Sequence, residues 1–154
     1  MIRAHRIRLN PNSEQETYFR KACGTRRFVF NLGLAEWKRQ YEAGEKPSAF
    51  LLKKQFNAIK GEQFPWVYEV TKCAAEGAFM DLATAFKNFF EGRKKGQTVG
   101  YPNFKQKKRS RDGFYVDNEP FRLSGHCIKL PHIGLVNMAE KLRWACKVLS
   151  AHIT

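Results

Sequence analysis

The most regular alternation of apolar and polar positions lies between about Thr71 and Glu91. Four apolar side chains recur there at i, i+3, i+7 and i+10: Phe79, Leu82, Phe86 and Phe89. This spacing places them on one face of an α-helix. The pattern predicts a long helix whose phenylalanine stripe belongs to the hydrophobic core.

Helical patterns also fill the chain from residue 13 to about residue 43. Ser13-Glu14-Gln15-Glu16 has the form of a capping box, whose two end side chains would accept backbone N–H groups. Gly24-Thr25 is expected to divide the region into two helices with a helix-turn-helix-like corner between them. Gly44 is expected to end the second helix in a left-handed cap.

A further helix is predicted from Pro47-Ser48 to about Lys60, where Gly61 closes it. A short turn around Pro65-Trp66 then leads into the long helix with the phenylalanine stripe.

Strand patterns lie at the two ends of the chain. Residues 2–9 interleave apolar and basic side chains up to Asn10-Pro11, where proline ends any ladder. Short β-prone segments follow residue 112: 113–116, 121–123, 127–130, 134–138 and 147–154. They favour small hairpins or a partial barrel. The simplest arrangement is an α+β fold in which the first strand pairs with the later ones and the helices are an insertion. The last segment is strand-like up to Thr154, which indicates an incomplete chain.

The charge of the chain adds information about its partners. The chain has 28 basic and 14 acidic residues, a net charge of +14, which favours a polyanionic partner. Eight basic residues and no acidic residue fall between Arg93 and Arg111. Such side chains neutralise phosphates, and the aromatic rings of Tyr101 and Phe104 among them are candidates to stack on unpaired bases. The alternative is a plain solvated loop.

Cysteine spacing favours neither zinc binding nor a disulfide framework. The four cysteines are widely separated and form no CxxC pair. His126, Cys127 and His132 lie close in the sequence but lack a fourth donor. Buried thiols in a reducing compartment are expected. The sequence has no apolar run long enough for a membrane span or a signal peptide, so we expect a cytoplasmic protein.

The acidic residues do not have the pattern of a nuclease. Metal-dependent hydrolysis of nucleic acids uses clustered carboxylates that hold two ions about 4 Å apart. Asp81, Asp112 and Asp117 are isolated, and no GxxxxGK[ST] loop is present. We therefore expect no catalysis by this chain alone, and no cofactor.

Five blocks of the sequence are specific as an ordered set: MIRAHRIRLNPNSEQE, CGTRRFVFNLGLAEWKRQYEAG, PWVYEVTKCAAEGAFMDLATAFKNFFEG, VGYPNFKQKKRSRDGFYV and IKLPHIGLVNM. In this order they resemble OrfB/TnpB proteins encoded by bacterial insertion sequences. Each block is modest alone, but the ordered set extends from residue 1 to residue 138 of the 154.

The resemblance implies the domain organisation of an RNA-guided DNA endonuclease. Residues 1–10 and 112–154 would form a small wedge-type β-barrel, residues 11–92 an inserted helical recognition domain, and residues 93–111 a basic linker. In the family this half binds the guide RNA and reads a short motif beside the DNA target. The other half holds a RuvC-like nuclease and a zinc finger, so magnesium and zinc are expected only there.

The resemblance also implies sites on the two nucleic acids. The positions expected to face the target-adjacent duplex are Lys72, Cys73, Glu76, Gly77, Asp117 and Asn118. Family members often have Gln where this chain has Glu76. A glutamate accepts hydrogen bonds only, for example from cytosine N4, so a different or lost motif is implied. The residues expected to bind nucleic-acid backbones are Arg3, Arg6, Arg8, Arg26, Arg27, Arg93, Lys94, Lys95, Lys105, Lys107, Lys108, Arg109 and Arg111.

Three functions follow as hypotheses. The first is the nucleic-acid-binding, non-catalytic N-terminal portion of a TnpB-like protein, with guide RNA and double-stranded DNA as partners. The second is one subunit of a split nuclease whose RuvC-like half is a separate chain. The third is a standalone DNA-binding repressor that uses the helix-turn-helix-like corner.

Overall fold

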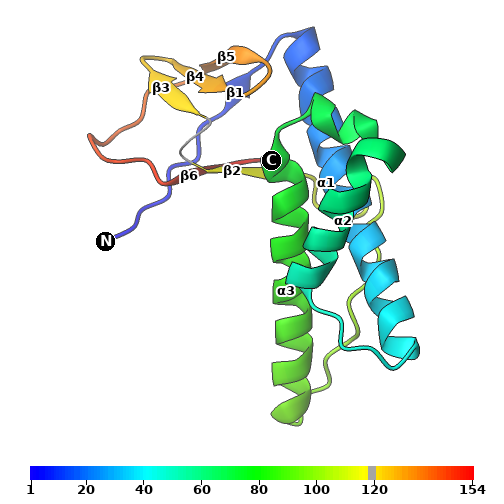
Figure 1. Ribbon diagram of the computed structural model, residues 1–154. Coiled ribbons are helices and arrows are strands. Elements are labelled where there is room, and N and C mark those ends of the chain that lie inside the picture. Colours follow the sequence, from blue (N-terminus) through cyan, green and yellow to red (C-terminus); the bar gives the residue numbers. More distant parts are fainter. Residues whose placement is uncertain (118–120) are drawn as a thin grey trace.

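Three helices stand beside two small antiparallel sheets in the computed structural model, which describes residues 1–117 and 121–154 (Figure 1). The helices are α1 (Ser13–Glu42), α2 (Ala49–Gln63) and α3 (Lys72–Lys94), with a short 3-10 helix, η1 (Pro65–Glu69). The strands are β1 (Leu9–Asn10), β2 (Phe114–Asp117), β3 (Arg122–Ser124), β4 (Cys127–Leu130), β5 (Gly134–Met138) and β6 (Ser150–Ile153). The α+β prediction is confirmed.

The first strand pairs with a late one, as the sequence predicts. Strands β1, β5, β4 and β3 form one sheet in that order, and Leu9 lies opposite Met138. Strands β2 and β6 form a separate two-stranded sheet. The described strands do not close into a barrel, because β1 and β3 remain at the edges of the larger sheet and β2 pairs with β6 instead. The expected wedge-type barrel is therefore not supported.

The first strand is much shorter than predicted. Only Leu9–Asn10 joins the ladder, although the expected alternation persists upstream, where His5 and Ile7 are half-buried between exposed neighbours. The Arg8 carbonyl accepts a hydrogen bond from Ala139, just beyond β5. Because β5 ends at Met138, residues 2–8 have no strand beside them among the described residues.

The capping box of α1 is shifted by one residue from its predicted position. Asn12, and not Ser13, is the N-cap: its Oδ1 accepts from the Gln15 backbone N–H at 2.8 Å. The Gln15 side chain in turn accepts from the Asn12 backbone N–H at 3.0 Å. Gln15 Nε2 also donates to the Leu135 carbonyl at 2.7 Å, which ties this cap to β5.

The predicted break at Gly24-Thr25 is wrong, because α1 is one continuous helix of 30 residues. A helical glycine costs about 1 kcal/mol relative to alanine. Fully buried Ala22 and Val29 flank this position, so packing on both sides outweighs that cost. The first sharp corner comes after α1, where Gly44 takes the predicted left-handed conformation (φ +81°).

The later helices follow their predictions closely. Ser48 caps α2, which continues two residues past Gly61, and Thr71 caps α3. The phenylalanine stripe is core: Phe79, Leu82 and Phe86 are buried, and Phe89 is half-buried.

Two hydrophobic clusters hold these elements together. The sheet cluster joins the start of α1 and α3 to the strands; its buried residues are Tyr18, Ala22, Val70, Ala74, Phe114, Val116, Phe121, Ile128, Leu130, Val136 and Met138. The helical cluster lies among the three helices and η1; its buried residues are Val29, Phe30, Leu34, Trp37, Leu52, Phe56, Val67, Ala78, Phe79, Leu82 and Phe86. Trp37 stacks on Phe86 with centroids 3.8 Å apart and an interplanar angle of 9°.

The strands after residue 112 also match their predictions, except the last. Only Ser150–Ile153 of the expected segment 147–154 pairs, with β2.

Among the described residues, no helix is long and apolar enough to cross a membrane.

Candidate nucleic-acid interface

A tight basic turn lies between α3 and β2. Its ends are joined by the Ser110 N–H donating to the Gln106 carbonyl at 2.9 Å and by the Gln106 N–H donating to Ser110 Oγ at 2.9 Å. Three exposed basic residues form its tip: Lys107, Lys108 and Arg109. Lys108 has φ +67°, a left-handed conformation that is uncommon outside glycine. We call residues 105–111 the basic turn.

Asn31 of α1 fixes the start of the basic turn. Its Nδ2 donates to the Lys105 carbonyl at 2.9 Å, and its Oδ1 accepts from the Lys105 N–H at 2.7 Å. The Lys105 ammonium lies 4.3 Å from the centre of the Phe30 ring, a cation–π contact. The turn is therefore held at a defined position on α1.

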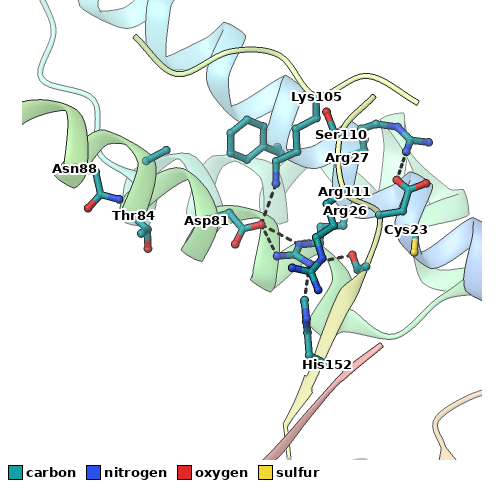
Figure 2. Close-up of a pocket in the computed structure, with 14 residues that line it drawn as sticks. Cys23, Arg26, Arg27, Asp81, Thr84, Asn88, Lys105, Ser110, Arg111 and His152 are labelled. Carbon is teal, nitrogen blue, oxygen red and sulfur yellow. Dashed lines mark hydrogen bonds and ion pairs between the residues drawn. The ribbon is translucent and has the colours of Figure 1, made fainter. Parts of the chain in front are cut away.

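Asp81 of α3 is shared between two cations. Its Oδ2 accepts from Arg26 Nε at 2.9 Å, from Arg26 Nη2 at 2.5 Å and from Lys105 Nζ at 3.1 Å, as Figure 2 shows. All three side chains are largely shielded from solvent: the exposed fraction is 15% for Arg26, 28% for Lys105 and 31% for Asp81. One carboxylate thus joins α1, α3 and the basic turn.

Arg26 also reaches the two-stranded sheet. Its Nη1 donates to the Gly113 carbonyl at 2.9 Å and lies 3.2 Å from His152 Nε2 on β6 (Figure 2). Burial, with positive charge from Arg26 and Arg111, lowers the pKa of His152, while Asp81 opposes this shift. A neutral imidazole with a free lone pair on Nε2 can accept the Arg26 hydrogen bond.

Arg27 makes its own ion pair, with Asp112, at 2.6 Å. Burial raises the pKa of the nearby Cys23 thiol, and the negative charge of Asp112 adds to this shift. Arg26 and Arg27, both predicted to bind phosphate, are therefore engaged within the chain.

These groups border an open pocket of about 440 Å³ (Figure 2), which we call the Asp81 pocket. Its lining residues are Cys23, Arg26, Arg27, Phe30, Asp81, Thr84, Ala85, Asn88, Lys105, Ser110, Arg111, Asp112, Gly113 and His152. Four of these are Lys or Arg and two are Asp, so the lining carries a net positive charge.

The structure divides the predicted basic linker into two groups. Arg93 and Lys94 end α3 and Lys95 caps it, where positive charge complements the helix dipole. The chain then runs back along the helices toward β2 (Figure 1), so the basic turn lies apart from this helix end. Neighbours in sequence are therefore not one continuous basic face.

The two predicted stacking residues differ in their surroundings. The Tyr101 ring meets Phe86 and Phe89 edge-on, each at 5.4 Å, and Lys38 lies 5.7 Å from its centre. Phe104 is 49% exposed. Phe104 is thus the more available surface for a base.

The predicted motif-reading residues on α3 lie in its first turns. Lys72 is exposed, whereas Cys73 and Gly77 are buried. Glu76 is half-buried and pairs with Lys53 of α2 at 3.3 Å. Asp117 is half-buried at the end of β2, and Asn118 lies outside the described residues.

The predicted N-terminal arginines precede β1. Arg3, Arg6 and Arg8 are exposed, and the Arg3 guanidinium lies 5.6 Å from the centre of the Trp144 ring.

Within the described ranges, 1–117 and 121–154, no group of three or more His, Cys, Asp or Glu side chains is placed to hold a metal ion. The four cysteines are free.

The sequence reasoning missed Asn31 and His152, and treated Asp81 as an isolated acid. Asn31 directly follows the apolar Phe30 in the sequence, and this neighbour is the local signal that places it near the core side of the helix. The partners of all three residues are distant in the sequence, so only the fold brings them together.

Comparison with known proteins identifies the class of this domain. Residues 1–46, which contain β1 and α1, match the helix-turn-helix domain of the OrfB/IS605 family.

Three relatives extend the match to most of the chain. The Escherichia coli K12 protein InsQ is 30% identical over 139 residues, which are 86% of this chain and 32% of InsQ. Rv2885c of Mycobacterium tuberculosis is 27% identical over 161 positions, 92% of this chain and 35% of the relative. A Streptomyces pristinaespiralis protein is 30% identical over 114 residues, 71% of this chain and 26% of the relative.

All three relatives are named as RNA-guided DNA endonucleases, so the resemblance to the OrfB/TnpB family is confirmed. The chain spans about a third of the length of the curated relatives it matches.

Proposed function

We propose that this chain is a nucleic-acid-binding N-terminal portion of a TnpB-like protein, and that it binds guide RNA and target-adjacent duplex DNA. The observation that carries the proposal is the basic turn, which presents Lys107, Lys108 and Arg109 to solvent on a backbone anchored by Asn31. Basic side chains on a fixed backbone lose less freedom when they meet phosphates than those on a mobile loop.

The relatives support the choice of partner. They are named as RNA-guided DNA endonucleases, and about a third of their length aligns with this chain. The family model that residues 1–46 match is described as a helix-turn-helix domain, a class that contacts nucleic acid, although in this chain these residues form β1 and the single helix α1.

We also propose that the chain does not cut DNA by itself and needs no metal to bind. Each of its three aspartates has another setting: Asp81 and Asp112 pair with arginines, and Asp117 lies in β2. With RNA and DNA substrates, binding should persist in EDTA, and no cleavage should follow the addition of Mg²⁺. Metal-dependent cutting by highly purified protein would disprove the proposed lack of catalysis.

The central test is the salt dependence of binding. Replacing Lys107, Lys108 and Arg109 together with Gln should reduce the magnitude of the log–log salt slope by about 2–3, because each lost phosphate contact removes about 0.7–0.9. The matched control replaces Arg20, Lys21 and Arg39, which are exposed but ion-paired. That control makes the same change in net charge and should leave the slope nearly unchanged. Equal effects of the two triple variants would reject the basic turn as the contact surface.

Motif reading is tested by selection from randomised duplexes, with RNA present if binding requires it. Base-edge contacts discriminate by about 1–3 kcal/mol each, whereas phosphate contacts only position the protein. Glu76→Gln and Asn118→Ala should each shift the preferred sequence more than they change total affinity. Identical preferences in the wild type and both variants would remove these two positions from the reading site.

A further inference from the structure

The charges of the Asp81 pocket are unbalanced. Asp81 Oδ2 is the shared acceptor for Arg26 and Lys105, so this trio carries one net positive charge. Arg27 and Asp112 neutralise each other. Arg111, at the end of the basic turn, adds a second positive charge to the lining.

Donors remain on the pocket wall after the internal contacts are counted. Lys105 Nζ has three N–H bonds, and among the described residues one of them is directed to Asp81. Ser110 Oγ accepts from the Gln106 N–H, and within residues 1–117 and 121–154 its hydroxyl hydrogen is left to donate to a ligand. The Arg111 side chain is exposed at the rim. These donors come from the same anchored turn.

We propose that the Asp81 pocket binds a phosphate group, held by Lys105, Ser110 and Arg111. A phosphate accepts several hydrogen bonds at once and is the common anion of nucleic acids, and charge-assisted contacts of this kind are among the strongest in proteins. Arg26 and Asp81 fix the positions of the binding groups, because Arg26 also bonds to the Gly113 carbonyl at the far side of the pocket. The pocket is distinct from the exposed tip of the turn, since Lys107, Lys108 and Arg109 do not line it.

The phosphate has two sources in a nucleic acid, a strand end and an internal phosphodiester. Identification of the source rests on the proposed nucleic-acid binding, whereas binding of the free anion does not. The two are therefore measured separately.

The first measurement is the thermal stability of the full chain in inorganic phosphate against chloride at equal ionic strength. A ligand that binds only the folded state raises the melting temperature in a concentration-dependent way. Arg111→Gln should weaken phosphate binding about 10- to 100-fold, because it removes a charge-assisted contact. Thr84→Glu should do the same by placing a negative charge on the pocket wall formed by α3.

Two controls make the same changes in charge elsewhere. Ala83→Glu adds a carboxylate to the neighbouring exposed position of α3, outside the pocket lining. Lys95→Gln removes a cation at the far end of α3. Both should retain the phosphate response of the wild type. The absence of a saturable response in the wild type, or equal losses in Ala83→Glu and Thr84→Glu, would overturn the proposal.

The second measurement compares 5′-phosphorylated and 5′-hydroxyl strands of one sequence, with inorganic phosphate as competitor. A preference for the phosphorylated strand that is lost in Thr84→Glu identifies a strand end, and equal competition on both strands identifies an internal phosphodiester. Phosphate binding without binding of either strand would reject the proposed function and keep the pocket. Strand binding without any phosphate response would reject the pocket and keep the proposed function.

Discussion

Asn31 bonds to both backbone groups of Lys105, a residue 74 positions further along the chain. A side-chain amide that pairs with the N–H and C=O of one residue imitates the pairing of a neighbouring strand. The contact attaches the basic turn to α1 without any strand at that place.

Asn31→Ala removes both hydrogen bonds and should lower the free energy of unfolding by about 1–3 kcal/mol, because a half-buried peptide group loses its partners. Urea denaturation measures the change. Asn103→Ala, at an exposed position two residues before Lys105, is the control and should stay within about 0.5 kcal/mol of the wild type. Similar losses in both variants would show that Asn31 does not anchor the turn.

The glycines of α1 should respond in opposite directions to alanine. At Gly24 an added Cβ would meet only Arg27 Nη2, at 3.9 Å, so Gly24→Ala should raise the free energy of unfolding by about 0.5–1 kcal/mol. At Gly33 the Cβ would lie 2.9 Å from Leu82 Cδ2, so Gly33→Ala should lower it by about 1–3 kcal/mol. Denaturant unfolding followed by helical circular dichroism tests both. A destabilising Gly24→Ala would contradict the room that the structure leaves for a Cβ at this position.

The two aromatic residues of the linker should separate into a binding role and a packing role. Phe104→Ala should weaken binding of single-stranded nucleic acid by about 1–3 kcal/mol and change stability little, because its ring is exposed. Tyr101→Ala should lower the free energy of unfolding by about 1–3 kcal/mol, because its ring packs on Phe86 and Phe89. Fluorescence titration and urea denaturation of each variant measure the two effects. A loss of stability in Phe104→Ala together with weaker binding in Tyr101→Ala would contradict these two roles.

Stability should fall as acid protonates His152. Its folded pKa lies below the ordinary value of 6.5, mainly through burial, so near that pH the unfolded chain binds more protons than the folded chain. The contribution is complete above about 6.5 and is lost as the pH falls from there through the folded pKa.

Urea midpoints between about pH 5 and 8 test this dependence. The decline should be smaller in His152→Gln than in the wild type. The control is His126→Gln, at an exposed position in the turn between β3 and β4, and it should behave as the wild type does. Parallel curves for the wild type and His152→Gln would exclude this histidine as the cause.

Periodicity predicted the helices well, because their apolar stripes are local signals. The stripe from Phe79 to Phe86 is buried as expected, and α3 begins at Lys72, one residue after its predicted start. The errors arose where tertiary packing overrode a local rule. The low helix propensity of Gly24 predicts a break, whereas packing in the two hydrophobic clusters on either side keeps α1 continuous.

The candidate site was predicted only in its charges. The run of basic residues indicated a polyanion partner, but not that Lys105 faces inward to Asp81 while Lys107 faces solvent. That distinction depends on contacts with α1 and α3, and neither helix contributes a local signal to the linker. The predicted barrel is not supported for a related reason. Strand patterns predict that strands exist, whereas the pairing of distant strands is determined by the whole fold.

Because α1 is continuous, it forms one stiff connection between the sheets and the basic turn. At 1.5 Å per residue its 30 residues extend about 45 Å. Its first turns pack against the strands through Tyr18, and its later turns pack against the other helices through Trp37 and bond to the basic turn through Asn31. A stiff rod fixed at both ends transmits a tilt instead of absorbing it. A partner that shifts the sheets would therefore move the basic turn as well, so that a displacement at one end of the molecule changes the position of its charged surface.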